Sequence, residues 1–161
     1  MEGIKFLILD VDGTLTDGGI YLSDEGKQFK KFNVKDGIGI KKAIYEGIEV
    51  GVISHSYSRK MIDDRADMLG LKYVYVGQKS KLEVMDQWLS ELGLSRNEVA
   101  YMGDDINDLE VMKVVGCAAC PADSSEEVIK IVQQVMKKNG GAGAVREFID
   151  HHLLKNRLSG G

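Results

Sequence analysis

Asp10 and Asp12 are the residues of this sequence whose type and spacing most directly suggest chemistry. They follow a short apolar run at residues 4–9, which is typical of a buried strand in a parallel sheet. Residues i and i+2 of a strand share a face, so both carboxylates can project near the carboxyl end of this strand. Carboxylates this close repel each other and are costly to desolvate, unless a cation binds between them. The pair therefore indicates a site for a divalent metal ion.

Further polar residues stand where other strands are predicted to end or where a helix begins: Ser54, Lys81, Asp104, Asp105 and Asp108. The carboxyl ends of strands in an open parallel sheet border one crevice, so these groups can converge with Asp10 and Asp12. Carboxylates suit Mg²⁺, which keeps waters and a substrate phosphate among its ligands. A hydroxyl and an ammonium suit phosphoryl oxygens, and an aspartate can serve as a nucleophile through an aspartyl-phosphate.

The elements that must position these groups alternate along the chain. Strand patterns are found at 4–9, 48–53, 71–76, 98–102 and 117–120, and helical patterns at 34–46, 58–68, 79–92, 109–114 and 144–154. This alternation predicts an α/β fold, a Rossmann-like, doubly wound parallel sheet with right-handed crossovers. There is no interdomain linker, so we expect one domain over residues 1–161.

Two short strand patterns at 20–22 and 28–32 flank a polar loop, which predicts a β-hairpin. The hairpin, at about residues 18–33, directly follows the first carboxylates, so it can form a small flap over the site. A Gly-rich stretch at 138–143 lacks the spacing of a dinucleotide-binding loop and is expected to be a mobile closing segment. With the last helix it forms a C-terminal unit at about 138–156.

Composition narrows the classes of partner. The formal net charge is −4 and no basic stripe is present, so we expect no nucleic-acid partner. No apolar stretch approaches the length of a membrane helix, and the N-terminal run is too short for a signal peptide, so we expect a cytoplasmic protein without membrane contact. Cys117 and Cys120 fall on opposite faces of a predicted strand, which indicates two buried, reduced thiols.

The motifs resemble those of the haloacid dehalogenase (HAD) superfamily of phosphatases. They are Asp-Val-Asp-Gly-Thr at 10–14, the strand-end Ser54, Lys81 and Gly-Asp-Asp-Ile-Asn-Asp at 103–108. Phe-Asn-Val-Lys-Asp-Gly at 32–37 and Gly-Gly-Ala-Gly-Ala-Val-Arg-Glu at 140–147 are similar to the branch of this superfamily that has no cap domain. The resemblance extends over about residues 4–154.

This resemblance implies a Mg²⁺-dependent phosphomonoester hydrolase of a 2-keto-3-deoxy sugar-acid phosphate. The first expected substrate is 3-deoxy-manno-octulosonate (KDO) 8-phosphate, and a nonulosonate 9-phosphate of the KDN or N-acetylneuraminate type is the alternative. The branch also implies a homotetramer in which the hairpins associate and a neighbouring subunit helps to close each site.

The same resemblance implies a role for each motif residue. Asp10 would be the nucleophile and a metal ligand, and Asp104 the second carboxylate ligand. Asp12 would act as general acid and then general base, with its backbone carbonyl on the metal. Ser54 and Lys81 would bind the phosphoryl oxygens. Two further carboxylates would orient metal-bound water and Lys81: Asp105 and Asp108.

One departure from the branch lies beside the expected sugar site. Sugar-acid phosphatases usually have Gly after the strand-end hydroxyl, often followed by Arg, whereas this chain has His55 and Ser56 and is one residue longer before Arg65. We assign substrate binding to His55, Arg65 and Arg146, since Arg offers a bidentate fork to a carboxylate. A half-exposed loop histidine, a surface salt bridge of Arg65 and an internal ion pair of Arg146 stay open as alternatives.

Two functions from other classes account for part of the same pattern. Non-catalytic tetramerisation modules of sugar-nucleotide synthetases resemble this chain, but degraded carboxylates are expected there, and Asp10, Asp12 and Asp104 are intact. A response-regulator-like phosphoacceptor shares the carboxylates, the hydroxyl and the lysine. A phosphoacceptor function, however, explains neither the second carboxylate at Asp12, two residues after Asp10, nor the hairpin.

Overall fold

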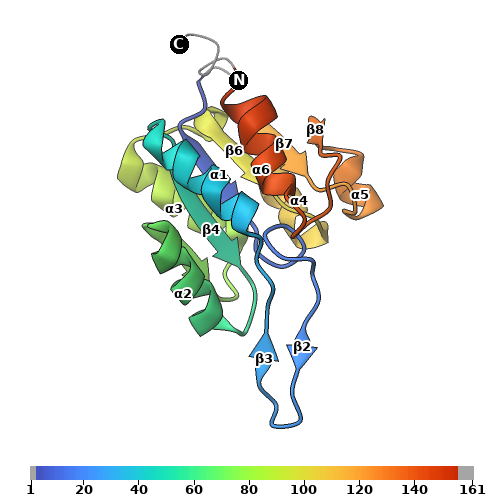
Figure 1. Cartoon of the computed structure of the whole chain (residues 1–161). Coiled ribbons are helices and arrows are strands. Elements are labelled where there is room, and N and C mark those ends of the chain that lie inside the picture. Colours follow the sequence, from blue (N-terminus) through green and yellow to red (C-terminus); the bar gives the residue numbers. More distant parts are fainter. Residues whose placement is uncertain (1–2, 156–161) are drawn as a thin grey trace.

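A computed structural model describes residues 3–155 of the chain. Its centre is a six-stranded parallel sheet in the order β5-β4-β1-β6-β7-β8 (Figure 1). The strands are β1 (Phe6–Leu9), β4 (Glu49–Ser54), β5 (Tyr73–Val76), β6 (Val99–Met102), β7 (Cys117–Cys120) and β8 (Gln134–Val135). The predicted α/β class is confirmed, and residue 156, the expected end of the C-terminal unit, lies outside the described residues.

Helices cover both faces of this sheet (Figure 1). One face packs against α1 (Val34–Tyr45), α2 (Arg59–Leu69), α6 (Ala144–Phe148) and the π-helical turn η3 (Ile149–Leu153). The other face packs against α3 (Lys81–Leu92), α4 (Leu109–Met112) and α5 (Glu126–Ile129). Cys117 and Cys120 lie in the separate cores of the two faces, so the prediction of two free, buried thiols is confirmed.

The direction of winding changes at β1. From β1 the chain moves outward through β4 to β5, and it then crosses back to β6 and continues to β7 and β8. The carboxyl ends of β1 and β6 therefore border the switch point of the sheet, where open α/β sheets hold their ligands. Asp10 follows β1 and Asp104 follows β6 at this point.

The predicted hairpin is present and projects from the body of the molecule (Figure 1). Its strands β2 (Tyr21–Leu22) and β3 (Gln28–Phe29) pair antiparallel, and a bridge between Thr16 and Phe32 closes its base. The described residues include no cap domain beyond this hairpin. They also contain no helix whose length and apolar character would let it cross a bilayer.

Gly140 and Gly141 pack tightly against the turn that follows β1. A Cβ atom on Gly140 would lie 1.8 Å from the carbonyl oxygen of Gly13, and one on Gly141 would lie 2.4 Å from the backbone nitrogen of Asp17. The amide of Gly141 also donates to the carbonyl of Thr14 at 3.2 Å. Close approach of two backbones, rather than the mobility expected from the sequence, accounts for these glycines.

Candidate active site

A polar cleft of about 250 Å³ opens at the carboxyl ends of β1 and β6. The residues that line it are Asp10, Asp12, His55, Ser56, Asp104, Asp105 and Asn107. The carboxylates thus converge at the switch point of the sheet, as their positions after the strands predict.

Asp10 stands at the floor of this cleft. Its amide continues the sheet by donating to the carbonyl of Met102 at 2.9 Å, and only 5% of the residue is exposed. Gly13 then turns the chain with a φ of +86°, and a Cβ atom there would lie 1.9 Å from Oδ2 of Asp104. Glycine at position 13 therefore lets the carboxylate from β6 approach the loop that carries Asp10.

Lys81, the first residue of α3, contacts the Asp10 carboxylate from the start of that helix. Its ammonium is buried and donates to Oδ1 of Asp10 at 2.8 Å and to Oδ1 of Asp108 at 2.7 Å. Burial alone would lower the pKa of Lys81, but Asp10 and then Asp108 outweigh it and raise the pKa above its ordinary value. Lys81 is therefore a fixed positive charge beside the candidate nucleophile.

Both carboxylate oxygens of Asp108 accept hydrogen bonds from other groups of the protein. Its Oδ1 accepts from the Tyr101 hydroxyl as well as from Lys81, and its Oδ2 accepts from the amides of Asp104 and Asp105 at 3.0 and 3.3 Å. Tyr101 is a buried β6 residue that sequence reasoning missed, because an aromatic in an apolar strand gives no sign of a polar partner. Asp108 thus links Lys81, Tyr101 and the loop after β6, and its expected supporting role stays a prediction.

Asp10, Asp104 and Asp108 each offer a carboxylate oxygen within 4.8 Å of the others. Burial, followed by the charge of Asp108, raises the pKa of Asp10 well above its ordinary value, although Lys81 opposes this. Burial also raises the pKa of Asp104 to about 6, with Asp108 and Asp105 adding to the effect against a hydrogen bond from Asp10. A divalent cation would relieve this crowding, and the donor set suits a hard ion.

Ser54 and Asp105 complete the predicted set. Ser54 ends β4, is buried, and its Oγ accepts from the amide of Ser56 at 3.0 Å, so the hydroxyl proton can be donated to a ligand. Asp105 is exposed at the rim of the cleft, where its Oδ1 accepts from the amide of Ile106 at 2.7 Å.

Comparison with known proteins shows the family to which this chain belongs. Residues 70–149 match the family described as haloacid dehalogenase-like hydrolase. The KDO 8-phosphate phosphatase KdsC of Escherichia coli K12 is 42% identical over 153 residues, which span 95% of this chain and 81% of that protein. The chain belongs to the haloacid dehalogenase-like hydrolases.

Solved structures agree with this assignment. The KDO 8-phosphate phosphatase of Yersinia pestis has a TM-score of 0.93 at 40% identity, covering 98% of this chain and 85% of that one. The enzyme of Moraxella catarrhalis in complex with magnesium, phosphate and KDO has a TM-score of 0.91 at 34% identity, covering 96% and 87% of the two chains.

In this HAD-like hydrolase, His55 lines the cleft, and both its ring and its backbone carbonyl form hydrogen bonds with the protein. Its Nε2 donates to the carbonyl of Lys79 at 2.9 Å, because a carbonyl can only accept, and Gln78 donates to the carbonyl of His55 at 2.9 Å. The β5–α3 connection therefore holds the loop that carries His55.

Neither arginine assigned to the substrate lines the cleft of its own chain. Arg65 donates to the carbonyl of Asn33 at 3.3 Å and stands 5.7 Å from the centre of the Phe32 ring. Arg146 pairs with Asp150, so the alternative of an internal ion pair is the arrangement found. Their contact with substrate stays a prediction.

Lys30 is a residue of this HAD-like hydrolase that sequence reasoning missed. It follows β3, and its ammonium forms an ion pair with Oδ1 of Asp12. Its side chain is only 2% exposed, whereas that of Asp12 is 37% exposed. A lysine in a polar hairpin is ordinarily solvated, so no pattern in the sequence signalled that this one turns into the site.

Proposed function

We propose that this chain is a Mg²⁺-dependent phosphatase that hydrolyses KDO 8-phosphate to KDO and phosphate. The observation that carries the chemistry is the placement of Asp10 between Lys81 and the carboxylate of Asp104 at the switch point of the sheet. The substrate is inferred from the relatives. KdsC is similar to this chain in sequence over nearly its whole length, and the KDO-bound enzyme of Moraxella catarrhalis is similar in both sequence and fold.

Asp10 and Asp104 would hold the magnesium ion through their carboxylates, and Asp12 through its backbone carbonyl. Asp108 is less suited as a ligand, because both of its oxygens already accept hydrogen bonds from the protein. When bound, the ion offsets the negative charge of a phosphate brought beside Asp10.

In the first half-reaction, a carboxylate oxygen of Asp10 attacks phosphorus and the phosphorus–oxygen bond to the sugar breaks. Asp12 acts in its protonated form, with Oδ1 accepting from Lys30 and the proton on Oδ2, and donates that proton to the leaving sugar oxygen. The Ser54 hydroxyl and the Lys81 ammonium hold phosphoryl oxygens, and Lys81 needs no reorganisation because it is already fixed beside Asp10.

In the second half-reaction, Asp12 takes a proton from water, and the water oxygen attacks the phosphorus of the aspartyl-phosphate. The bond between phosphorus and Asp10 breaks, which releases inorganic phosphate and restores both carboxyl groups to their starting states. The partly exposed position of Asp12 gives it access to both the sugar oxygen and the water.

Phosphate release from a panel of sugar-acid phosphates, with and without Mg²⁺, tests this proposal. We expect Mg²⁺-dependent turnover of KDO 8-phosphate that exceeds turnover of KDN 9-phosphate and N-acetylneuraminate 9-phosphate. Preference for a nonulosonate ester would keep the chemistry and overturn the substrate. Absence of release from every ester would overturn the enzyme and favour the non-catalytic tetramerisation module.

Magnesium binding is expected to weaken about tenfold between pH 8 and pH 5. Mg²⁺ binds the ionised carboxylate, and a pKa of about 6 for Asp104 means that protons compete below that pH at about a tenfold loss per unit. Isothermal titration of the protein with Mg²⁺ across this range measures the slope. Asp104→Asn should weaken binding and make this pH dependence shallower, with the raised pKa of Asp10 leaving a remainder, while the hairpin-loop control Asp24→Asn should preserve it. Equal wild-type affinity at pH 8 and pH 5 would contradict the assignment.

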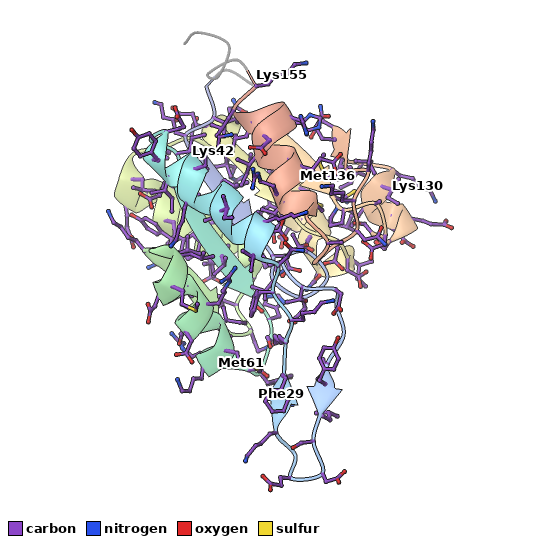
Figure 2. All side chains as sticks on the ribbon, viewed as in Figure 1. Phe29, Lys42, Met61, Lys130, Met136 and Lys155 are labelled. Atoms are coloured by element: carbon purple, nitrogen blue, oxygen red, sulfur yellow. The ribbon has the colours of Figure 1, made fainter. Side chains whose placement is uncertain are left out.

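We also propose that the chain forms a homotetramer through its hairpins. Ile20, Tyr21, Leu22 and Phe29 are each at least half exposed, and Figure 2 shows Phe29 on the hairpin, outside the packed body. Apolar side chains gathered in this way are typical of a surface that associates. The residues that line the cleft, as far as the described chain shows, include no arginine, so a neighbouring subunit could supply the cation for the sugar acid.

Light scattering is expected to give a mass about four times the 17.7 kDa of the chain. Leu22→Asp should lower that mass, because it places a charge in the apolar contact, and Lys72→Asp on the exposed surface before β5 should not. A fully active wild-type monomer would refute the assembly.

We propose that residues 1–161 act as one phosphatase domain, since the cores on both sides share a single sheet. The cytoplasmic location expected from the sequence stays a prediction.

A further inference from the structure

The side chain of Lys30 is buried in a hairpin whose neighbouring side chains are exposed. Gln28 and Phe29, which precede it, are exposed, and Lys31, which follows it, is 63% exposed. The Lys30 side chain, by contrast, is 2% exposed and its ammonium is paired with Asp12. Burial of an ammonium costs free energy unless a partner compensates it, so the Asp12 carboxylate is what holds this lysine in place.

The arm of the hairpin that carries Lys30 is also attached on both sides of this residue. Before it, Oε1 of Gln28 accepts from the Ser58 hydroxyl at 2.8 Å, which links the arm to the loop after Ser54. After it, Nδ2 of Asn33 donates to the carbonyl of Gly141 at 3.2 Å. Residues 28–33 are therefore held against the loops around the cleft, and Lys30 is fixed at their centre.

We infer that Lys30 is a positioning residue, which holds the Asp12 carboxylate in place for proton transfer and couples the hairpin to catalysis. The inference rests on the proposed function, because it assigns to Asp12 the transfer of the proton. Lys30 acts through Asp12, whereas Lys81 acts on Asp10 and the phosphoryl group.

The magnitude follows from the geometry of proton transfer. A general acid or base must stand within hydrogen-bond reach of the atom it serves, and a displacement of about 1 Å can cost about 100-fold in rate. Without Lys30, the partly exposed Asp12 carboxylate has lost its charged partner on the hairpin and is free to take other rotamers. We therefore expect kcat to fall about 10- to 100-fold.

Three lysine variants test this inference by steady-state kinetics. Lys30→Met keeps the length of the side chain and removes the charge, so kcat should fall as above while KM changes less than about threefold. Lys30→Arg restores a cation and should recover most of kcat. Lys31→Met is the matched control on the exposed neighbour and should behave as wild type. Wild-type kcat in Lys30→Met would overturn the inference, as would a loss confined to KM.

A double variant separates action through Asp12 from direct contact with substrate. Asp12→Asn alone should reduce kcat strongly, and Lys30→Met added to it should cost little more, because the residue through which Lys30 acts is already lost. Losses that multiply would show that Lys30 acts independently of Asp12 and would overturn the inference.

Hydrogen exchange gives a readout that does not need activity. A two-stranded hairpin is marginally stable alone, so losing the anchor at Lys30 should speed exchange of the amides between Tyr21 and Phe29 by about fivefold or more. Asp12→Asn should produce the same change, since it breaks the same ion pair, and Lys31→Met should not. Unchanged exchange in Lys30→Met would overturn the coupling. A wild-type protein that hydrolyses no phosphomonoester would overturn the proposed function, and exchange would still decide the anchoring.

Discussion

Asp10→Asn is expected to reduce phosphatase turnover at least about 1,000-fold while leaving the fold intact. Asparagine has nearly the shape of aspartate, so the side chain can stay at the end of β1 and its amide oxygen can still accept from Lys81. It cannot form the aspartyl-phosphate, because an amide oxygen is a poor nucleophile toward phosphorus. The loss therefore falls on the chemical step.

Stability should change little in this variant, and the reason is electrostatic. Burial and the neighbouring Asp108 raise the pKa of Asp10, so its charge opposes folding near neutral pH in the absence of a cation, although Lys81 offsets part of the cost. Replacing the charge by an amide removes both the repulsion and part of the attraction to Lys81. We expect the free energy of unfolding in urea, without Mg²⁺, to stay within about 1 kcal/mol of wild type.

A matched pair of variants makes the test of Asp10 specific. Asp12→Asn keeps the nucleophile and loses both the acid and the base. With a phosphodonor whose leaving group needs no proton, such as acetyl phosphate, a labelled, hydroxylamine-sensitive phosphoenzyme should therefore accumulate in Asp12→Asn and never appear in Asp10→Asn. Asp24→Asn, in the hairpin loop, should turn over as wild type. Activity of Asp10→Asn within a few-fold of wild type, or a phosphoenzyme formed by it, would remove Asp10 from its proposed role.

The places of Asp10, Ser54 and Asp104 could be predicted because they depend on a short-range rule. Each residue stands at the end of an apolar run, and parallel strands bring those ends to one edge of the sheet. β8 escaped prediction for the opposite reason. It has only two residues, one of them a glutamine, which is too short for any periodicity to show.

Contacts made across long stretches of sequence could not be predicted. Lys30 pairs with Asp12 only because the hairpin arm folds back over the loop after β1. Arg65 carries the right group for a carboxylate, but its long side chain donates instead to the carbonyl of Asn33, which lies far from it in the sequence. The pair of Arg146 with Asp150 is local, and it is one of the alternatives that the sequence leaves open. Gly140 in a Gly-rich stretch suggests mobility, since a sequence does not show which backbone will approach a glycine.

Lys81→Met is expected to have the second large effect, on stability as well as on rate. The variant leaves the buried carboxylates of Asp10 and Asp108 without the ammonium that bridges them. Breaking a buried charge pair by removing one partner typically costs about 3–5 kcal/mol. Turnover should fall at least about 100-fold as well, because a fixed positive charge beside the phosphoryl group is lost.

The pH dependence of this loss identifies its cause. Without Lys81, the attraction and hydrogen bond that lower the pKa of Asp10 disappear, so this pKa, already raised by burial, rises further. A carboxyl whose pKa is higher in the folded state favours folding at low pH, and that contribution is lost as the pH rises through the folded pKa. Lys81→Met should therefore regain part of its stability relative to wild type when the pH falls from 8 to 5.

Urea denaturation of both proteins at pH 8 and pH 5 measures this difference, and Lys72→Met serves as the control on an exposed lysine. Mg²⁺ at pH 8 should restore part of the same loss, since a cation beside Asp10 compensates the charge that Lys81 no longer balances. Protonation at low pH and Mg²⁺ at high pH would then both neutralise the same uncompensated charge on Asp10. A loss of stability in Lys81→Met that neither acid nor Mg²⁺ reduces would instead indicate a packing defect. Lys81 would then not be the group that compensates the buried charges of Asp10 and Asp108.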